Sequence, residues 1–469
     1  MLKCDLLVDS KDLRATLLRL KKDEDFTILL DMTAVDYSKF PDSTPSRFAV
    51  VYVLRSSDFK KETTVKAFVS DETLSVDTVS DIFPSANWAE REAYDQYGVI
   101  FLNHPNLKRV LNHKQFVGHP LRKDYKITQG QICTETEDLM DEMLPLLKSK
   151  GYTDEEIADL MLLNVGPSHP ASHGTIRNFV ALEGETIAAC VTEIGYLHRG
   201  FEKACEHHTY SQVIPYTDRL NYCSAILNNI GWAKAIEDMM KIEITPRAKM
   251  IRVVIGELSR IIDHFVCNAA NMVDLGGLTS LWYLFGARDQ AYDLLSKLTG
   301  ARLTNTYTRI GGLEFDLYDG FDKDLEEVLK TSEKAIEDVL SLIAHNKLFH
   351  DRTQDVGVIK ADFALANGIS GPNLRAAGVA HDLRKDKPYY GYENFDFDLV
   401  IGSHGDVYDR MMCRFEESIQ SIKIIRQAMK NMPDGAINVY APNLVLPNKK
   451  DVYGNIEGLM NQFKLTFEG

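Results

Sequence analysis

The sequence has few of the features that mark a metal centre, a secreted protein or a membrane span. Its 469 residues include seven cysteines, and no two of these form a C-x-x-C pair. Their odd number and irregular spacing argue against a disulfide framework and against an iron–sulfur cluster bound by this chain alone. No apolar run approaches the roughly 18 residues that a membrane-spanning helix needs. The segment from Met1 to Lys11 has no long apolar core, so we expect no secretory signal.

The chain also lacks an excess of positive charge, with 53 Lys and Arg against 68 Asp and Glu. The formal net charge is −15 at pH 7, which argues against nucleic acid as the main partner. An acidic surface still permits docking onto basic protein partners. The length predicts two to four domains with large cores.

The N-terminal part, residues 1–125, predicts a small α+β domain. We expect a helix at 12–22, strands at 26–30, 48–54 and 63–69, and a helix from Val76 to Tyr97 that Gly98 closes. Two motifs in this part, residues 87–95 and 118–125, offer no pair of nucleophile and base, so they favour a structural or interaction role. Residues 126–160 lose the periodicity and predict a linker with a short helix near 153–163.

The remaining chain predicts a small sheet over 161–200 and a large helical bundle over 201–469. We expect strands at 162–165, 178–183 and 186–194, with a Gly184–Glu185 turn between the last two. We expect long helices at 220–242, 246–273, 279–298, 321–345 and 405–432. Thr217 or Asp218 would cap the first of these helices, and Thr245 with Pro246 would begin the second. One apolar stripe of the second helix predicts its buried face: Ile251, Val254, Leu258, Ile261, Phe265, Ala269 and Met272.

A loop from Gly166 to Arg177 carries two histidines, His169 and His173, four residues apart. Its two prolines exclude a helix, so the spacing does not predict a helical metal pair. No glutamate follows the first histidine, which excludes the zinc-protease motif. The loop is therefore either a polar turn with hydrogen-bonded histidines or one part of a site whose partners lie elsewhere in the chain.

The hairpin of the first two long helices offers such partners. Tyr222 precedes Thr245 by 23 residues and Asp274 follows Pro246 by 28 residues, so both would lie about 35–42 Å from the turn. A phenol and a carboxylate would then share one end of the hairpin. With an imidazole from the His loop, these groups could donate protons to a carbonyl compound that is being reduced, and no serine or cysteine nucleophile beside a base is apparent.

Several motifs resemble one known family, in order along the chain. Residues 166–174, 195–203, 216–222, 256–260, 274–276, 309–312 and 405–410 are similar to the D subunit (49-kilodalton type) of respiratory complex I. Residues 90–95 and 118–125 are similar to its C subunit (30-kilodalton type). The chain thus resembles a fused C–D subunit of the proton-pumping NADH:quinone oxidoreductase, whose bundle is related to nickel–iron hydrogenase large subunits.

The resemblance implies a quinone pocket shared with the partner B subunit. His169, His173 and Tyr222 would bind the quinone, and Asp274 would pair with His173. Arg199, Thr304 and Arg309 would lie near the 4Fe-4S cluster of the partner, with Thr304 where many relatives have histidine. NAD and FMN would be bound by other subunits.

The resemblance also implies partners and a location. The partners would be the B, I and H subunits and the E, F and G modules, without nucleic acid, at the cytoplasmic face of the bacterial inner membrane. Relatives continue beyond Gly469, so we expect a shortened C-terminal segment.

Two alternatives stay open. The first is a nickel–iron hydrogenase large subunit, which shares residues 199–202 but needs two C-x-x-C pairs, whereas only Cys205 lies in the relevant region. The second is an assembly or scaffold protein without activity. A nickel assay tests the first alternative, and quinone reduction by the purified complex tests the second.

Overall fold

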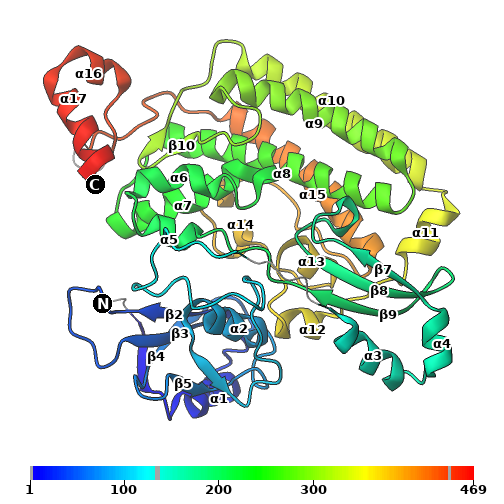
Figure 1. Cartoon of the computed structure of the whole chain (residues 1–469). Helices are drawn as coiled ribbons and strands as arrows, with labels where there is room; N and C mark the ends of the chain where they lie inside the picture. The colour runs from blue at the N-terminus through cyan, green and yellow to red at the C-terminus, as the bar shows by residue number, and fades with distance from the viewer. Residues whose placement is uncertain (1–3, 133–137, 442–444, 469) are drawn as a thin grey trace. The chain divides into compact units, whose positions relative to one another are not determined.

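The computed structural model describes residues 4–132, 138–441 and 445–468 (Figure 1). The chain forms two compact units. The first unit comprises Met1–Ala204 and Ala366–Gly368, and the second comprises Cys205–Leu365 and Ile369–Gly469. All the predicted strands lie in the first unit and the five predicted long helices in the second. The finer predicted limits at residues 125 and 160 stay predictions.

A four-stranded sheet organises the N-terminal part of the first unit. Its order is β1-β4-β3-β2, with β1 parallel to β4 and the other neighbours antiparallel. The strands are β1 Leu6–Asp9, β2 Ile28–Asp36, β3 Phe48–Arg55 and β4 Glu62–Val69. Apolar side chains of α1 (Leu13–Asp23) and α2 (Ala86–Tyr97) share one core with these strands. The predicted α+β fold is confirmed here, although β1 was not predicted and β2 runs further than expected.

The predicted helix from Val76 to Tyr97 is wrong in its first half. Residues Ser75–Asp77 form strand β5, which pairs in parallel with β6 (Ile100–Leu102). The helix begins only at Ala86, and the predicted end is confirmed, because Gly98 takes a left-handed φ of 78° and its N–H donates to Tyr94 O. Pairing with a strand after the helix decided the fold of residues 75–77, and a local pattern does not contain that information.

A second, three-stranded antiparallel sheet lies later in the first unit, in the order β7-β8-β9. The predicted strands are confirmed as β7 Met161–Val165, β8 Arg177–Glu183 and β9 Thr186–Glu193. Two helices precede the sheet, α3 Met140–Ser149 and α4 Asp154–Asp159. Part of the predicted linker is thus packed structure, because Leu139, Met143 and Leu147 share a core with the sheet. Residues 133–137 of that linker lie outside the described residues.

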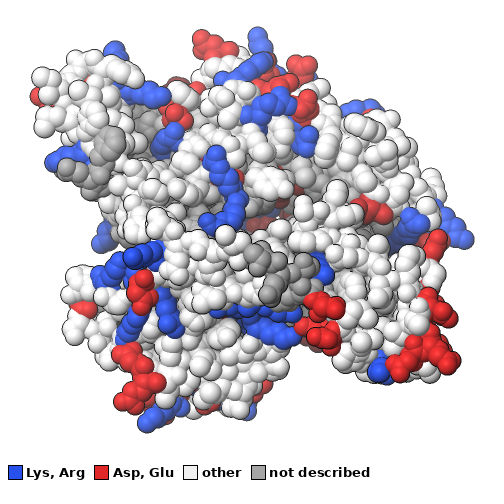
Figure 2. All heavy atoms as spheres, viewed as in Figure 1, with Lys and Arg blue, Asp and Glu red and all other residues white. Residues whose placement is uncertain are grey.

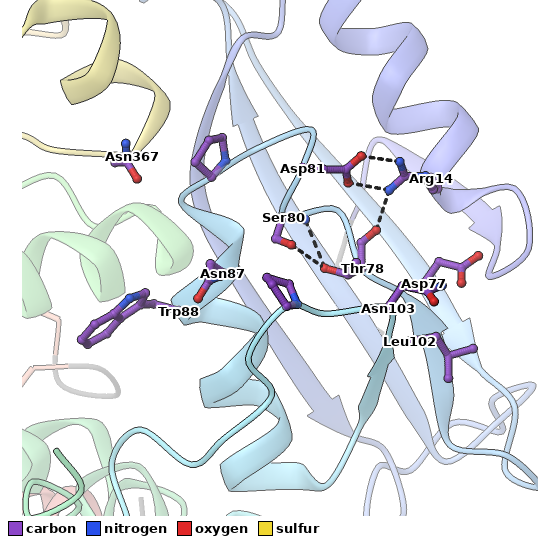
Figure 3. Close-up of a pocket in the computed structure, with 12 residues that line it drawn as sticks. Arg14, Asp77, Thr78, Ser80, Asp81, Asn87, Trp88, Leu102, Asn103 and Asn367 are labelled. Carbon is purple, nitrogen blue, oxygen red and sulfur yellow. Dashed lines mark hydrogen bonds and ion pairs between the residues drawn. The ribbon is translucent and has the colours of Figure 1, made fainter. Parts of the chain in front are cut away.

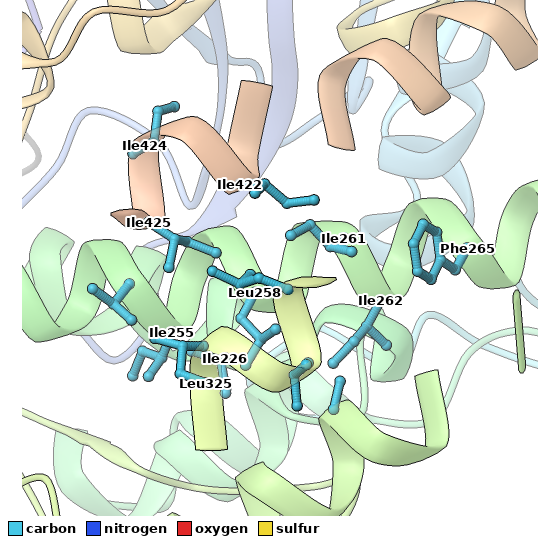
Figure 4. Packing of buried hydrophobic residues seen from close by; sticks show 14 of the residues in the cluster. Ile226, Ile255, Leu258, Ile261, Ile262, Phe265, Leu325, Ile422, Ile424 and Ile425 are labelled. Carbon is cyan, nitrogen blue, oxygen red and sulfur yellow. The ribbon is translucent and has the colours of Figure 1, made fainter. Parts of the chain in front are cut away.

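Long helices form the second unit, with α8 at their centre. They are α7 Ala225–Met240, α8 Pro246–Asp274, α9 Leu278–Thr299, α10 Phe321–Ile343 and α15 Val407–Lys430. Helix α8 packs against α9 and α15, and α9 packs against α10 (Figure 1). All seven residues of the predicted stripe are buried, and Leu258 and Ile261 lie on the side of α8 toward Ile422 and Ile425 of α15 (Figure 4). The helical bundle is confirmed, and its relation to hydrogenases stays a prediction.

The helix caps divide into confirmed and wrong predictions. Thr245 caps α8 as expected, accepting a hydrogen bond from Ala248 N at 3.2 Å, with Pro246 at the first helical position. The single helix predicted over 220–242 is wrong, because Tyr222–Ser224 form a 3₁₀ turn, η2, before α7. Thr217 ends the preceding helix, α6, so neither Thr217 nor Asp218 caps α7.

Short elements complete the described chain. The helices are α5 Phe201–Cys205, α6 Tyr210–Thr217, α11 Lys347–Thr353, α12 Ala361–Ala366, α13 Gly371–Ala376, α14 Leu383–Asp386, α16 Lys449–Gly454 and α17 Ile456–Phe463. The remaining elements are η1 Pro170–Ser172, η3 Tyr392–Asn394, η4 Lys464–Glu468 and the two-stranded pair β10 Thr308–Arg309 and β11 Gly312–Leu313.

Candidate functional site

The His loop joins β7 to β8 and is held tightly at its base. Gly166 takes a φ of +97°, and a Cβ at this position would lie 2.0 Å from Ile176 O, so only glycine fits. At the other stem, the buried Arg177 donates from Nε to Asn164 Oδ1 (2.9 Å) and from Nη1 to Glu193 Oε2 (3.0 Å). The side chains between the two stems are therefore presented on a fixed base.

Both histidines of the loop are exposed, and each has a defined backbone setting. His169 caps the 3₁₀ turn η1, with its Nδ1 accepting from Ala171 N at 3.1 Å. Neutral His169 therefore carries its proton on Nε2. His173 sits at the end of the turn with a left-handed φ of 46°, and Ser172 Oγ donates to His169 O and Gly174 O on either side of it. The loop is thus a hydrogen-bonded polar turn with exposed imidazoles, and its role as one part of a larger site stays a prediction.

Tyr222 lies in the second unit, on the turn η2, and 59% of its surface is exposed. The neighbouring Asn221 fixes this turn, because its side-chain amide donates to Ser224 Oγ (2.7 Å) and to Asp263 Oδ1 (3.3 Å) on α8. A large aromatic side chain on an anchored turn is thus left open to solvent.

The expectation that Tyr222 and Asp274 lie at one level of the hairpin is wrong. Because α7 begins at Ala225, the Tyr222 side of the hairpin is shorter than a continuous helix would be. The turn contacts α8 beside Asp263, eleven residues before Asp274, which corresponds to about 16 Å along the helix axis. Asp274 is the exposed last residue of α8. The turn that carries Tyr222 thus contacts α8 at a different level from Asp274.

The loop that carries Thr304 is tied to the segment before Tyr222. Asp218 is fully buried, and its carboxylate accepts hydrogen bonds from the backbone N–H (3.3 Å) and the hydroxyl of Thr306. Thr304 itself is half-buried. Arg309 donates to Glu314 Oε2 at 2.6 Å, and its own carbonyl accepts from Arg252 at 2.8 Å. Asp218 was missed as an anchor, although it lies inside the motif of residues 216–222.

Arg199 belongs to a segment that is bound to the N-terminal part of the first unit. Gly195 takes a φ of +119°, and a Cβ there would meet Asn112 O at 2.7 Å. The N–H groups of Leu197 and His198 both donate to Leu111 O at 3.1 Å. Arg199 itself is exposed. The glycine and the two backbone bonds fix the path of the chain immediately before this side chain.

The predicted site residues thus fall in separate units. His169, His173 and Arg199 lie in the first, and the second contains Tyr222, Asp274, Thr304 and Arg309. Their convergence into one site stays a prediction.

A buried charge network inside the second unit was not predicted. Glu257 on α8 accepts from Tyr392 Oη (2.6 Å), Ser421 Oγ (2.7 Å) and Arg384 (3.0 Å), and Arg260 lies one turn away at 3.2 Å. Burial alone would raise the pKa of Glu257, but the two arginines and the hydroxyls lower it to about 2. The charged residues inside an otherwise apolar helix were the signal that could have indicated this network.

The network continues along α8 and α15. Glu417 accepts from Arg375 Nε at 2.6 Å and contacts His264 Nε2 at 2.9 Å. Burial lowers the pKa of His264, whereas the histidine and Arg375 outweigh burial and lower the pKa of Glu417 to about 2. The two glutamates link four helices, α8, α13, α14 and α15, by charge as well as by apolar packing.

The two motifs of the N-terminal part both make structural contacts within the first unit. Asp95 accepts from the backbone N–H groups of Val110, Leu111 and Asn112 at 2.9–3.1 Å and from Arg109 at 2.6 Å. Residues 118–125 then pack on the end of α2, where Arg122 Nε donates to Tyr97 O at 2.6 Å.

A cleft of about 820 Å³ opens beside α2 in the first unit (Figure 3). Arg14 and Asp81 form a bidentate ion pair on its wall, and Trp88 lies exposed at its edge. Beneath the wall, the buried Glu90 accepts from Thr78 Oγ1 and from Val79 N (2.8 Å). Burial raises the pKa of Glu90 to about 7. None of the predicted site residues lines this cleft.

Metal ligands and membrane spans are both lacking in the described ranges. Among the residues described, no three or more His, Cys, Asp and Glu side chains gather as metal ligands would. Within the same ranges, no helix combines the length and the apolar character that crossing a membrane requires.

Comparison with known proteins adds independent evidence. The family "Respiratory-chain NADH dehydrogenase, 30 Kd subunit" matches residues 6–131, and the family "Respiratory-chain NADH dehydrogenase, 49 Kd subunit" matches residues 274–469. The C/D subunit of NADH-quinone oxidoreductase from Bdellovibrio bacteriovorus is 47% identical over 463 residues, covering 98% of this chain and 81% of that protein. The proteins of the same name from Psychrobacter cryohalolentis and Acinetobacter baylyi are 38% and 37% identical, covering 96% and 94% of this chain and 78% and 76% of their own lengths.

Proposed function

Because the chain belongs to the family of fused C/D subunits of NADH-quinone oxidoreductase, which join the 30- and 49-kilodalton parts of respiratory complex I, we propose that it forms the quinone-reduction pocket. It acts there with the partner B subunit. In this proposal His169, His173 and Tyr222 bind the quinone head group, and Asp274 pairs with His173. The chain is one subunit of an oxidoreductase, so its activity belongs to the assembled complex.

The chemistry of the proposed donors suits the reaction. Reduction of a quinone to a quinol takes two electrons and two protons. A free imidazole titrates near pH 6.5 and a free phenol near pH 10, so both types of group can hold a transferable proton at neutral pH. A carboxylate next to an imidazole stabilises its protonated form and selects its tautomer.

One observation carries the proposal: the anchored turn η2 leaves the phenol of Tyr222 open to solvent. The hydrogen bonds of Asn221 hold the turn on α8, and the bonds of Asp218 hold the segment before it. A positioned donor whose backbone is fixed loses little entropy when it engages a substrate. The His loop supports the proposal in the same way, because Gly166 and Arg177 fix the backbone on either side of His169 and His173.

The electrons would arrive from the 4Fe-4S cluster of the partner B subunit. Arg199, Thr304 and Arg309 would lie near that cluster. Proton loss from the His173–Asp274 pair would change its charge and bias a conformational switch toward the proton-translocating part of the complex. The other partners would be the I and H subunits and the E, F and G modules, with NAD and FMN bound elsewhere. The chain would lie peripherally on the cytoplasmic side of the inner membrane.

Substituting Tyr222→Phe tests the proposal. The ring stays and only the hydroxyl is lost, so we expect normal assembly and a fall in NADH:quinone turnover of about 100-fold or more. Electron transfer to a soluble acceptor that bypasses the quinone should stay unchanged. Tyr453→Phe is the matched control, because Tyr453 on α16 is also an exposed tyrosine and should leave turnover unaltered. Near-normal quinone turnover in the assembled Tyr222→Phe complex would remove Tyr222 from the site.

A further inference from the structure

Strand β7 is an unprotected edge of the second sheet. It pairs on one side with β8, in a register that sets Met161 opposite Leu182 and Val165 opposite Asn178. Within the described ranges, no backbone hydrogen bond reaches β7 from any other strand or loop. The N–H and C=O groups of its outer side are therefore open to another chain.

The first three side chains of β7 are apolar and exposed, and they alternate between the two faces of the sheet. Met161, Leu162 and Leu163 are 58%, 40% and 45% exposed. Protected edge strands have a charge, a proline or a bulge, whereas the five residues of β7 have none of these. Such an edge is a template for pairing with a further strand.

The opposite edge of the same sheet shows the contrast. Helix α3 packs against β9, and Lys150 Nζ donates to Ala188 O at 2.7 Å. The buried side chains of α3 contact the apolar residues of β9. One edge of the sheet is thus covered by this chain, and the other is not covered by the described residues.

Acidic side chains gather at the end of the sheet where β7 begins. Helix α4, which ends two residues before β7, contributes Asp154, Glu155, Glu156 and Asp159, and the β8–β9 turn contributes Glu183 and Glu185. The register brings this turn next to Met161, since its neighbour Leu182 lies opposite. Figure 2 shows red side chains concentrated over the α3–α4 part of the chain. Of this set, only Asp154 has an ion pair among the described residues, with Lys148 at 2.9 Å.

We propose that an extended segment of another subunit of the complex pairs with the free edge of β7 and adds a fourth strand to this sheet. Its side chains would be apolar where they meet Met161, Leu162 and Leu163. A lysine or arginine would lie at its end beside α4, since opposite charge fixes the direction of a strand that apolar contacts alone leave free. β7 leads directly into the His loop, but this proposal does not rest on the quinone chemistry.

The direct test uses the intact complex with a photo-reactive amino acid in place of Leu163. We expect a cross-link to a single segment of another subunit, identified by mass spectrometry, with apolar residues and a Lys or Arg within about five residues of the cross-link. The control is the same probe at Ile187, an exposed residue of β9, which should not reach that segment. Cross-links only within this chain, to a second copy of it, or to an acidic segment would overturn the proposal.

A second test alters charge and leaves the fold intact. The double variant Glu155→Lys, Asp159→Lys changes two exposed residues of α4 that have no ion pair among the described residues. We expect its association with the rest of the complex to weaken about tenfold at low salt and to lose most of its salt dependence. Glu72→Lys, at an exposed turn after β4, is the control and should associate normally. Equal association of the double variant and the control would overturn the proposed charge match.

Discussion

Two buried glutamates, Glu90 in the first unit and Glu257 in the second, show how partners decide the role of one residue type. Both side chains are fully buried. Glu90 meets a hydroxyl and a backbone N–H, and burial raises its pKa to about 7. Glu257 meets two arginines and two hydroxyls, and these lower its pKa to about 2 despite burial. The Glu90 carboxyl therefore titrates near pH 7, whereas the Glu257 carboxyl stays ionised at neutral pH.

A motif alone therefore does not assign chemistry to its acidic residues. Residues 90–95 and 256–260 each contain a glutamate, and both motifs resemble the same complex. Burial makes Glu90 titratable near neutral pH, whereas the neighbouring arginines keep Glu257 ionised as part of an ion network. Asp274 differs from both glutamates, because it is exposed at the end of the same helix as Glu257.

The largest effect is expected when the charge of Glu257 is removed. Glu257→Gln leaves the half-buried Arg260 without its anion and the buried Arg384 with Asp382 alone, so we expect the second unit to lose about 3 kcal/mol of stability at pH 7. The folded pKa lies below the ordinary value of 4.5. The charge contribution is therefore complete above about pH 4.5 and is lost as the pH falls toward about 2, and the deficit of the variant should shrink in acid. Urea unfolding of the wild type and the variant at several pH values measures the loss of stability at pH 7 and its decrease in acid.

An exposed ion pair provides the control for Glu257. Glu333 pairs with Arg426 at 2.7 Å, with about two fifths of each side chain exposed. Glu333→Gln should cost less than about 1 kcal/mol, because water screens such pairs. Equal costs for the two variants would contradict the view that the buried network stabilises the bundle.

Glu90 should show the opposite dependence on pH. Its folded pKa of about 7 lies above the ordinary 4.5, so the folded state holds a proton that the unfolded state has released. Stability of the first unit should therefore fall by up to about 3 kcal/mol as the pH rises from about 4.5 to about 7. Glu90→Gln should remove this slope, measured by hydrogen exchange of α2 at several pH values. Glu72→Gln, at an exposed position, should keep the slope.

The sequence predicted the fold where a local pattern marks the buried face or the start of an element. It failed where contacts with distant segments decide the structure. The stripe of α8 indicated its buried side, and Thr245 with Pro246 indicated its start. The strand at Ser75–Asp77 was missed because β6, which pairs with it, lies 25 residues later. The start of α7 was missed because the turn at Tyr222 is stabilised by a bond to Asp263 on another helix.

For the candidate site, the sequence suggested residue types, whose roles stay predictions, but it did not indicate the contacts that support them. The sequence indicated His173 and Tyr222 as proton donors. It did not indicate that Asp218 ties the Tyr222 segment to Thr306, or that Gly166 is required by the carbonyl of Ile176. Those supports are contacts between segments far apart in the chain, and no local spacing encodes them.

Asp274 is an exposed acidic residue at the end of α8, the helix that contains the buried Glu257. Asp274→Asn keeps the shape and removes the charge proposed to act on His173, so we expect stability to change by less than about 0.5 kcal/mol. Quinone turnover should fall about tenfold, or proton translocation should uncouple from it. Activity and proton pumping of the assembled complex measure this. Wild-type values for both would contradict the His173–Asp274 pair.

The smallest effect is expected at Thr304, which has no titratable group in the range pH 5–8. A histidine close to the cluster of the partner can gain a proton when the cluster gains an electron, which would link the potential to pH by about 59 mV per unit. With threonine there, we expect a potential that is nearly flat between about pH 6 and pH 8. Thr304→His should restore part of that slope and raise the potential by tens of millivolts. Thr304 is half-buried on a loop that Asp218 anchors at Thr306. We therefore expect the loop to keep its fold when histidine replaces this threonine. An EPR-monitored redox titration of the complex at several pH values decides the matter, and a steep slope in the unmodified complex would show that another group sets it.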